Sequence, residues 1–211
     1  MIKIFIVHYK KLTERKLFIL EQFKKHNITN FEFIEKYDRD NIDENDKMLF
    51  VENYDKTQIA ISLSHIYVYS EIFMKYENAL ILEDDAVLNN NFIEILNKYI
   101  ENTPIDYDML FIGNGCDLHI DNSRIVSDCN IYKKNVLTEW GTRCTDSYVV
   151  SKKGAIKIIN YINNIEYKIN ESIDWWLNRV LREKNFNIYW SEPTIVKQGS
   201  QCGLYNSSYN H

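Results

Sequence analysis

Residues that break regular structure are scarce in this sequence, since only two prolines and six glycines occur among its 211 residues. Internal repeats, low-complexity tracts and linker-like stretches are lacking as well. A chain of this length favours one domain, and it can bury a sizeable core without a disulfide framework. We therefore predict a single domain over residues 1–211.

Further absences argue against several classes of protein. The four cysteines lack Cys-x-x-Cys or Cys-x-x-His spacing, so zinc binding is disfavoured; free thiols are expected, although a bridge among Cys116, Cys129 and Cys144 stays open. The net charge of −5 provides no basic surface for nucleic acid. No apolar run approaches the roughly 20 residues of a membrane span, and the N-terminal run is too short for a signal peptide. These features predict a cytoplasmic protein that neither binds nucleic acid nor spans a membrane, with a symmetric homodimer as the default oligomer.

The hydrophobic pattern alternates between short apolar runs and longer segments of helical period. Strands are predicted over residues 2–7, 31–34, 79–82, 108–112 and 146–150, and helices over residues 13–26, 58–76, 92–100, 152–161 and 172–183. Residues 38–56 are acidic and irregular, which indicates a surface excursion, and residues 116–135 indicate a hairpin or loop. This order predicts an α/β fold with a mostly parallel central sheet flanked by helices.

Three consecutive carboxylates, Glu83, Asp84 and Asp85, follow the apolar strand at residues 79–82. Buried charges need partners or a metal, and ligands of open α/β sheets sit at the carboxyl ends of strands. Glu83 and Asp85 point to the same side of an extended turn, so both could hold one Mn²⁺ or Mg²⁺ ion. A solvated acidic turn is the alternative. We favour the metal site, whose cation would neutralise a diphosphate leaving group.

The loop after the first strand is a candidate nucleotide site. His8, Tyr9 and Lys10 could contact a base and ribose, and Arg15 a base or phosphate. A glycine-rich phosphate motif is lacking here, and the isolated Gly-x-Gly at residues 113–115 is too weak to assign.

Two helical segments allow both a structural and a functional interpretation. Asp174 lies in the first turn of a helix, where it complements the helix dipole, but it could also act as a general base. Trp175 and Trp176 beside it could stack on sugars, although tryptophans in helices are usually core residues. His65, within Leu63-Ser64-His65, is by residue type alone more often structural than a ligand contact.

Together these segments resemble the family 25 glycosyltransferases, which include lipopolysaccharide-type sugar transferases and procollagen galactosyltransferases. The resemblance rests on Leu-Ser-His at residues 63–65, Leu-Glu-Asp-Asp at residues 82–85 and Tyr-x-x-Ser-x-x-Gly-Ala at residues 148–155. Arg15 and Asp174 also match, whereas His8-Tyr9 replaces the family's Asn-Leu and the Gly-Cys before Leu-Ser-His is missing.

This resemblance implies a GT-A-type, Rossmann-like fold, a UDP-sugar donor such as UDP-galactose or UDP-glucose, Mn²⁺ or Mg²⁺, inversion at the anomeric carbon, and a glycan or protein hydroxyl as acceptor. Residues 1–115 would bind the donor and residues 116–211 the acceptor. It implies Asp174 as the catalytic base and Glu83 and Asp85 as metal ligands. The implied substrate contacts are His8, Tyr9, Lys10, Arg15, Ser64, His65, Asp84, Trp175, Gly199 and Ser200.

The tail is expected to complete the site. Gly199 and Ser200 could form a phosphate-facing loop, since glycine permits close backbone approach. His211 is a candidate further metal ligand. Two alternatives remain: a carbohydrate-binding or degenerate transferase domain without activity, and a metal-dependent phosphohydrolase. A His-rich cluster and an Asp-x-Asp at the first strand, which would favour the hydrolase, are lacking.

Overall fold

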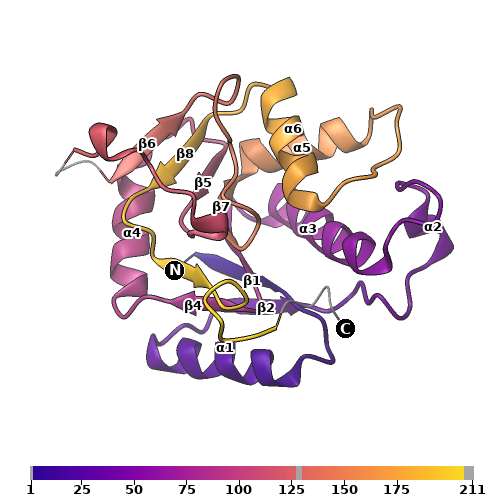
Figure 1. Cartoon of the computed structure of the whole chain (residues 1–211), viewed down its shortest axis with the longest axis horizontal. Helices are drawn as coiled ribbons and strands as arrows, with labels where there is room; N and C mark the ends of the chain where they lie inside the picture. The colour runs from indigo at the N-terminus through magenta and orange to yellow at the C-terminus, as the bar shows by residue number, and fades with distance from the viewer. Residues whose placement is uncertain (1, 127–129, 207–211) are drawn as a thin grey trace.

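The computed structural model describes residues 2–126 and 130–206, which form a seven-stranded sheet with helices on both faces (Figure 1). The sheet strands are β1 (Lys3–Val7), β2 (Phe31–Ile34), β3 (Asn78–Glu83), β5 (Met109–Phe111), β6 (Ile131–Lys134), β7 (Ser147–Ser151) and β8 (Ile188–Ser191). The α-helices are α1 (Thr13–Lys25), α2 (Glu44–Lys47), α3 (Lys56–Lys75), α4 (Phe92–Asn102), α5 (Lys152–Ile162) and α6 (Ile173–Glu183). Each strand and helix predicted from the pattern is present, with bounds that differ by a few residues at most.

The strands lie in the order β2-β1-β3-β7-β5-β8-β6. Pairing is parallel between β2 and β1, β1 and β3, and β5 and β8, and antiparallel for β7 and β6 with their neighbours, so five strands share one direction. The expected mostly parallel sheet is thereby confirmed. The reversed β7 at its centre was not predicted. Between β5 and β7 the described residues contain no α-helix, and a parallel neighbour would need such a crossover.

The central strands are buried on both faces, because alternate side chains point into two separate cores. In β1, Phe5 and Val7 face the core beneath α3, α5 and α6, whereas Ile4 and Ile6 face the core beneath α1 and α4. Figure 1 shows α1 on the opposite side of β1 from α3. Among the described residues, none of the helices has the length and apolar character needed to cross a bilayer.

A two-stranded ribbon not predicted from the sequence brings the tail back to the carboxylates. β4 (Ala86–Leu88) begins directly after Asp85 and pairs antiparallel with β9 (Val196–Gln198). The chain after β9, yellow in Figure 1, therefore lies beside β4 and α1.

The expected surface excursion over residues 38–56 is more ordered than its composition indicated. It contains α2, and Phe50 is buried and bridges to Ile169. A single buried aromatic residue therefore anchors an otherwise polar segment to the body of the protein.

Candidate active site

Asp84 joins the end of β3 to the loop after β1. The two strands are parallel neighbours with Val7 opposite Glu83, so the residues that follow them meet at the carboxyl edge of the sheet. His8 Nδ1 donates to Asp84 Oδ2 at 2.8 Å and Arg15 Nη1 donates to Asp84 Oδ1 at 2.8 Å. Both oxygens of this buried carboxylate therefore already accept hydrogen bonds from the protein.

A pocket opens beside Asp84, and we call it the strand-end pocket. It is lined by Val7, His8, Tyr9, Leu12, Arg15, Tyr37, Arg39, Thr57, Ala60, Ile61, Ser64, Glu83 and Asp84. The guanidinium of Arg39 lies over the Tyr9 ring, 4.3 Å from its centroid. Flat aromatic and guanidinium surfaces suit a planar base, because both offer faces for stacking.

The chain after β9 closes over the neighbouring carboxylate, Asp85. The Gly199 amide donates to the Asp85 carbonyl at 2.7 Å, and the Ser200 amide donates to Asp85 Oδ2 at 3.0 Å. A Cβ on Gly199 would lie 2.7 Å from that carbonyl oxygen, so only glycine allows this approach. Arg15 Nη2 donates to the Asn206 carbonyl at 2.8 Å, which ties the same segment to α1.

Three carboxylates gather behind this loop, namely Glu83, Asp85 and Asp146. Burial raises the pKa of Asp85, and the nearby charge of Glu83 raises it further, against the hydrogen bonds from Ser200. Burial also raises the pKa of Asp146 well above its usual range, and the charges of Glu83 and Asp85 add to this effect. Asp85 Oδ1 and Asp146 Oδ1 are buried, and neither has a hydrogen-bond partner among the residues that the structure describes. A bound cation, or protonation of one of these carboxylates, would therefore stabilise the cluster.

The carboxylate oxygens of this cluster suit a divalent cation, but they would supply only part of its coordination shell. Among residues 2–126 and 130–206, no three His, Cys, Asp or Glu side chains are arranged to hold a metal. Mg²⁺ usually takes one or two carboxylates and completes its shell with water and substrate phosphates. Asp85, with its partnerless oxygen, and Glu83 fit that pattern, whereas the oxygens of Asp84 are engaged by His8 and Arg15.

His65 lies behind Glu83 and does not line the strand-end pocket. Its ring is fully buried, with Nδ1 2.7 Å from the Tyr148 hydroxyl and Nε2 3.6 Å from Glu83 Oε1. The Tyr148 hydroxyl lies 2.7 Å from that of Tyr69, and burial raises the pKa of both phenols, which keeps them neutral. This buried chain of polar groups ends on the carboxylate of Glu83.

A second pocket, which we call the tryptophan pocket, is lined by Cys116, Leu118, Trp140, Thr142, Cys144, Asp174 and Trp175. Asp174 opens α6, and the Ser172 hydroxyl donates to its Oδ1. The sulfurs of Cys116 and Cys144 are 3.1 Å apart but not bonded, and Cys202 is also free, as expected from the sequence. Burial raises the pKa of the Cys144 thiol. Cys129 lies outside the described residues.

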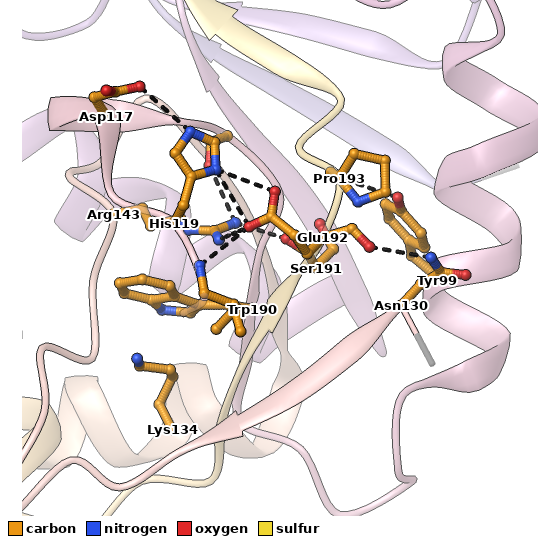
Figure 2. A network of polar contacts seen from close by, with 12 residues as sticks. Tyr99, Asp117, His119, Asn130, Lys134, Arg143, Trp190, Ser191, Glu192 and Pro193 are labelled. Carbon is orange, nitrogen blue, oxygen red and sulfur yellow. Dashed lines mark hydrogen bonds and ion pairs between the residues drawn. The ribbon is translucent and has the colours of Figure 1, made fainter. Parts of the chain in front are cut away.

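An ion-pair network, buried at the Arg143–Glu192 pair and exposed at His119, holds two walls of the tryptophan pocket. Figure 2 shows Glu192 in contact with both the His119 ring and the guanidinium of Arg143, which donates to Glu192 Oε2 at 2.7 Å. His119 Nδ1 lies 3.1 Å from Glu192 Oε1, and the Ile120 amide donates to Oε2 at 3.2 Å. Arg143 also stacks on Trp190, 4.4 Å from the ring centroid. Glu192 thereby fixes both the segment after Cys116 and the segment around Arg143.

The sequence-based candidates thus fall into two groups and two exceptions. His8, Tyr9, Arg15, Ser64, Glu83 and Asp84 line the strand-end pocket, with Gly199 and Ser200 on the adjacent Asp85. Asp174 and Trp175 line the tryptophan pocket. Lys10 and His65 are the exceptions, because neither lines a pocket. Lys10 Nζ lies 2.7 Å from Asp38 Oδ2, and His65 is buried behind Glu83. His211 lies outside the described residues.

Sequence reasoning missed Asp146, Arg39 and Trp140. Asp146 had a signal, because it precedes an apolar strand much as Glu83 ends one, but a single carboxylate there is not distinctive. Arg39 lies in the segment interpreted as an excursion, and Trp140 in an irregular loop. Their places near the pockets depend on tertiary contacts that local patterns do not reveal.

Comparison with known proteins gives a consistent set of matches. A family model described as glycosyltransferase family 25 (LPS biosynthesis protein) matches residues 1–173. A protein of Acanthamoeba polyphaga mimivirus named "Putative glycosyltransferase R655" is 30% identical over 128 residues, which cover 56% of this chain and 40% of that protein. This chain therefore spans less than half the length of the mimivirus relative.

Two solved structures are also similar. S. aureus TarS 1–349 in complex with UDP-GlcNAc has a TM-score of 0.48 and 11% identity, covering 93% of this chain and 57% of that one. A glycosyltransferase involved in the glycosylation of the major capsid of PBCV-1 has a TM-score of 0.41 and 14% identity, covering 91% and 92%.

Proposed function

Because the chain belongs to glycosyltransferase family 25, we propose that it transfers a hexose from a nucleotide diphosphate sugar to a hydroxyl of an acceptor. The observation that carries this proposal is the contrast between two adjacent carboxylates at the end of β3. Asp84 is engaged by His8 and Arg15 beside a pocket suited to a base, while Asp85 keeps a partnerless oxygen beneath the Gly199 loop. A nucleotide and its diphosphate fit these two neighbouring places.

The donor side is assigned to residues 1–115 together with the tail loop. His8, Tyr9 and Arg15 would contact the nucleotide, and the amides around Gly199 and Ser200 would approach the phosphates. Asp85 and Glu83 would hold Mn²⁺ or Mg²⁺, which supplies positive charge to the departing diphosphate. His65 would act through Glu83, by holding that carboxylate in place from the buried side.

The acceptor side is assigned to residues 116–211, with Asp174 as general base. The carboxylate of Asp174 takes the proton of the acceptor hydroxyl while that oxygen bonds to the anomeric carbon. The bond between this carbon and the diphosphate oxygen breaks, and the nucleoside diphosphate leaves with the electron pair. A direct displacement of this kind inverts the anomeric carbon and needs no covalent intermediate. UDP-galactose and UDP-glucose are the proposed donors.

Thermal stabilisation by nucleotides tests the donor assignment. UDP and UDP-sugars, tried with and without Mn²⁺, should raise the melting temperature only with metal; a ligand at 100 times its Kd adds about 2.7 kcal/mol to the free energy of unfolding. Asp85→Asn should abolish the effect, whereas Glu94→Gln, at an exposed carboxylate on α4, should not.

Each competing function makes a different prediction in the same assay. Stabilisation by UDP-sugars without any turnover would indicate a binding domain. Phosphate release from generic phosphate esters without preference for sugar nucleotides would indicate a phosphohydrolase. Absence of any shift across the panel would contradict nucleotide binding at the strand-end pocket.

A further inference from the structure

Two of the four tryptophans are exposed and touch each other at the tryptophan pocket. Trp140 is 45% exposed and Trp175 is 57% exposed, whereas Trp176 and Trp190 are 0% and 2% exposed. The rings of Trp140 and Trp175 meet edge to face with centroids 4.8 Å apart. Large exposed aromatic surfaces grouped beside a pocket mark ligand-binding sites more often than chance exposure does.

The backbone beneath Trp140 is held rigidly by the residue that follows it. The Gly141 amide donates to Asn178 Oδ1 on α6 at 2.8 Å, and the Trp190 indole donates to the Gly141 carbonyl at 2.8 Å. The pocket continues through Thr142 and Cys144, which flank the Arg143 of the Glu192 network. Both tryptophans are therefore displayed on a framework that is fixed before any ligand arrives, which lowers the entropic cost of binding.

The polar group beside the two indoles is a carboxylate with one oxygen available. Ser172 donates to Asp174 Oδ1, while Oδ2 makes no hydrogen bond within the described part of the chain. The other side chains at the pocket are the thiols of Cys116 and Cys144, the hydroxyl of Thr142 and the apolar Leu118. No cation lines this pocket among the described residues, so an anionic ligand would meet only negative charge.

These features match the chemistry of a neutral sugar. One face of a pyranose ring presents C–H groups that pack on an aromatic face, while its hydroxyls donate to carboxylates and accept from indole N–H groups. A peptide that adds to a sheet edge is bound mainly through backbone hydrogen bonds, whereas none of the residues that line this pocket belongs to a strand of the described sheets.

We propose that Trp140 and Trp175 form a platform for the terminal sugar ring of a glycan acceptor and place its reactive hydroxyl against Asp174. The acceptor is thus a saccharide rather than a protein hydroxyl. The role of the platform in transfer rests on the proposed function, but sugar binding to the platform does not.

Iodide quenching of tryptophan fluorescence tests the platform in the intact protein without donor. Iodide should reach Trp140 and Trp175 but not the buried Trp176 and Trp190. Lactose, cellobiose and N-acetyllactosamine, added separately at millimolar concentrations, should reduce the quenchable fraction for at least one of them. A collagen-like Gly-Pro-Hyp peptide should leave that fraction unchanged.

Variants separate the platform from general surface effects. Trp175→Ala should weaken saccharide binding at least tenfold, measured by the chemical shifts of the sugar in NMR titrations. Trp140→Phe, which keeps an aromatic face, should retain most of the binding. Met48→Ala, at an exposed apolar side chain that lines a different pocket, should have no effect.

Protection by the peptide alone, protection by none of the sugars, or unchanged sugar binding in Trp175→Ala would each overturn the proposal. UDP-dependent stabilisation is measured independently, so the two ideas can fail separately. Protection by a sugar without nucleotide binding would contradict the proposed transferase function and support the sugar-binding platform. Nucleotide binding without protection by any sugar would support the donor site and contradict the platform.

Discussion

Two neighbouring aspartates have different roles because their side chains have different partners. Asp84 and Asp85 have the same side chain and both are buried. Asp84 forms a buried ion pair with Arg15 and a hydrogen bond with His8, which links β3 to α1 and β1. Asp85 receives two hydrogen bonds from the tail, but its Oδ1 has no partner within residues 2–126 and 130–206. Their substitution should therefore have different consequences.

Asp84→Asn should lower the free energy of unfolding by about 3 kcal/mol, because breaking a buried ion pair leaves Arg15 without a compensating charge. Asp85→Asn should cost less, since it removes a carboxylate whose ionisation is disfavoured by burial. Urea denaturation of both variants, without metal or nucleotide, measures the difference. Equal losses would show that Asp84 does not hold β1, β3 and α1 together.

The assignment of Asp174 predicts a kinetic effect without a binding effect. Asp174→Asn preserves size but cannot accept the acceptor proton, so kcat should fall by about 10²- to 10⁴-fold. The Kd for UDP with Mn²⁺, measured by calorimetry, should stay unchanged, because Asp174 lines the other pocket. Ser172→Ala, which removes the hydroxyl that orients Asp174, should cause a smaller loss. Transfer by Asp174→Asn at near wild-type rate would contradict the assignment.

At the scale of elements, apolar strands and long amphipathic helices could be predicted from the sequence. Short strands that form only by pairing with a distant segment could not. The strand over residues 79–82 is recognised by its own composition and is observed as Asn78–Glu83. The ribbon of Ala86–Leu88 with Val196–Gln198 is only three residues long and joins segments about 110 positions apart, so nothing local indicates it. That ribbon brings Gly199 and Ser200 to Asp85, which the sequence could suggest only through resemblance to a family.

The turn after β5 shows why a weak motif could not be assigned in advance. Gly113 and Gly115 resemble a fragment of a phosphate loop, but their missing side chains make room for Asp146. A Cβ on Gly113 would lie 2.1 Å from Asp146 Oδ2, and one on Gly115 would lie 2.7 Å from Oδ1. The motif is thus explained by packing against a carboxylate on another strand end.

Gly113→Ala should therefore destabilise the protein by about 3 kcal/mol, at the upper end for overpacking. Gly203→Ala is the matched control, because its Cβ would meet nothing within 4 Å. It should cost only about 1 kcal/mol, from the left-handed backbone at φ +80°. Thermal denaturation of both variants tests the comparison. Similar losses would mean that Asp146 moves aside easily.

On the scale of the whole molecule, three acidic residues gather where the two halves of the chain, residues 1–115 and 116–211, meet. Glu83 ends β3, Asp85 lies in the turn between β3 and β4, and Asp146 directly precedes β7. The Glu83 amide donates to the Asp146 carbonyl at 2.9 Å, and the Thr145 hydroxyl donates to Glu83 Oε1 at 2.8 Å. The region proposed to bind the donor and the region proposed to bind the acceptor thus share this junction. Protonation there should affect the stability of the entire protein.

The sign of that effect follows from the raised pKa of Asp146. Below the unfolded-state pKa of about 3.9, the carboxyl is protonated in both states. As pH rises, the unfolded chain loses this proton first, while the folded protein retains it until its higher pKa is reached. The folded state therefore binds more protons, and the free energy of unfolding falls with increasing pH. Asp146→Asn removes this dependence.

Melting temperatures of wild type and Asp146→Asn between pH 4.5 and 7.5, without metal, should therefore diverge, with the variant gaining relative stability as pH rises. Asp121→Asn should instead run parallel to wild type over this range, because hydrogen bonds from Ser123 lower the pKa of the exposed Asp121 carboxyl. Its stabilising contribution is complete above the unfolded-state pKa and is lost only as pH falls below that value, outside the measured range. Parallel curves for wild type and Asp146→Asn would mean that Asp146 ionises as readily in the folded protein as in the unfolded chain. The buried Asp146 would then carry a full negative charge, which would require a compensating cation even before the donor binds.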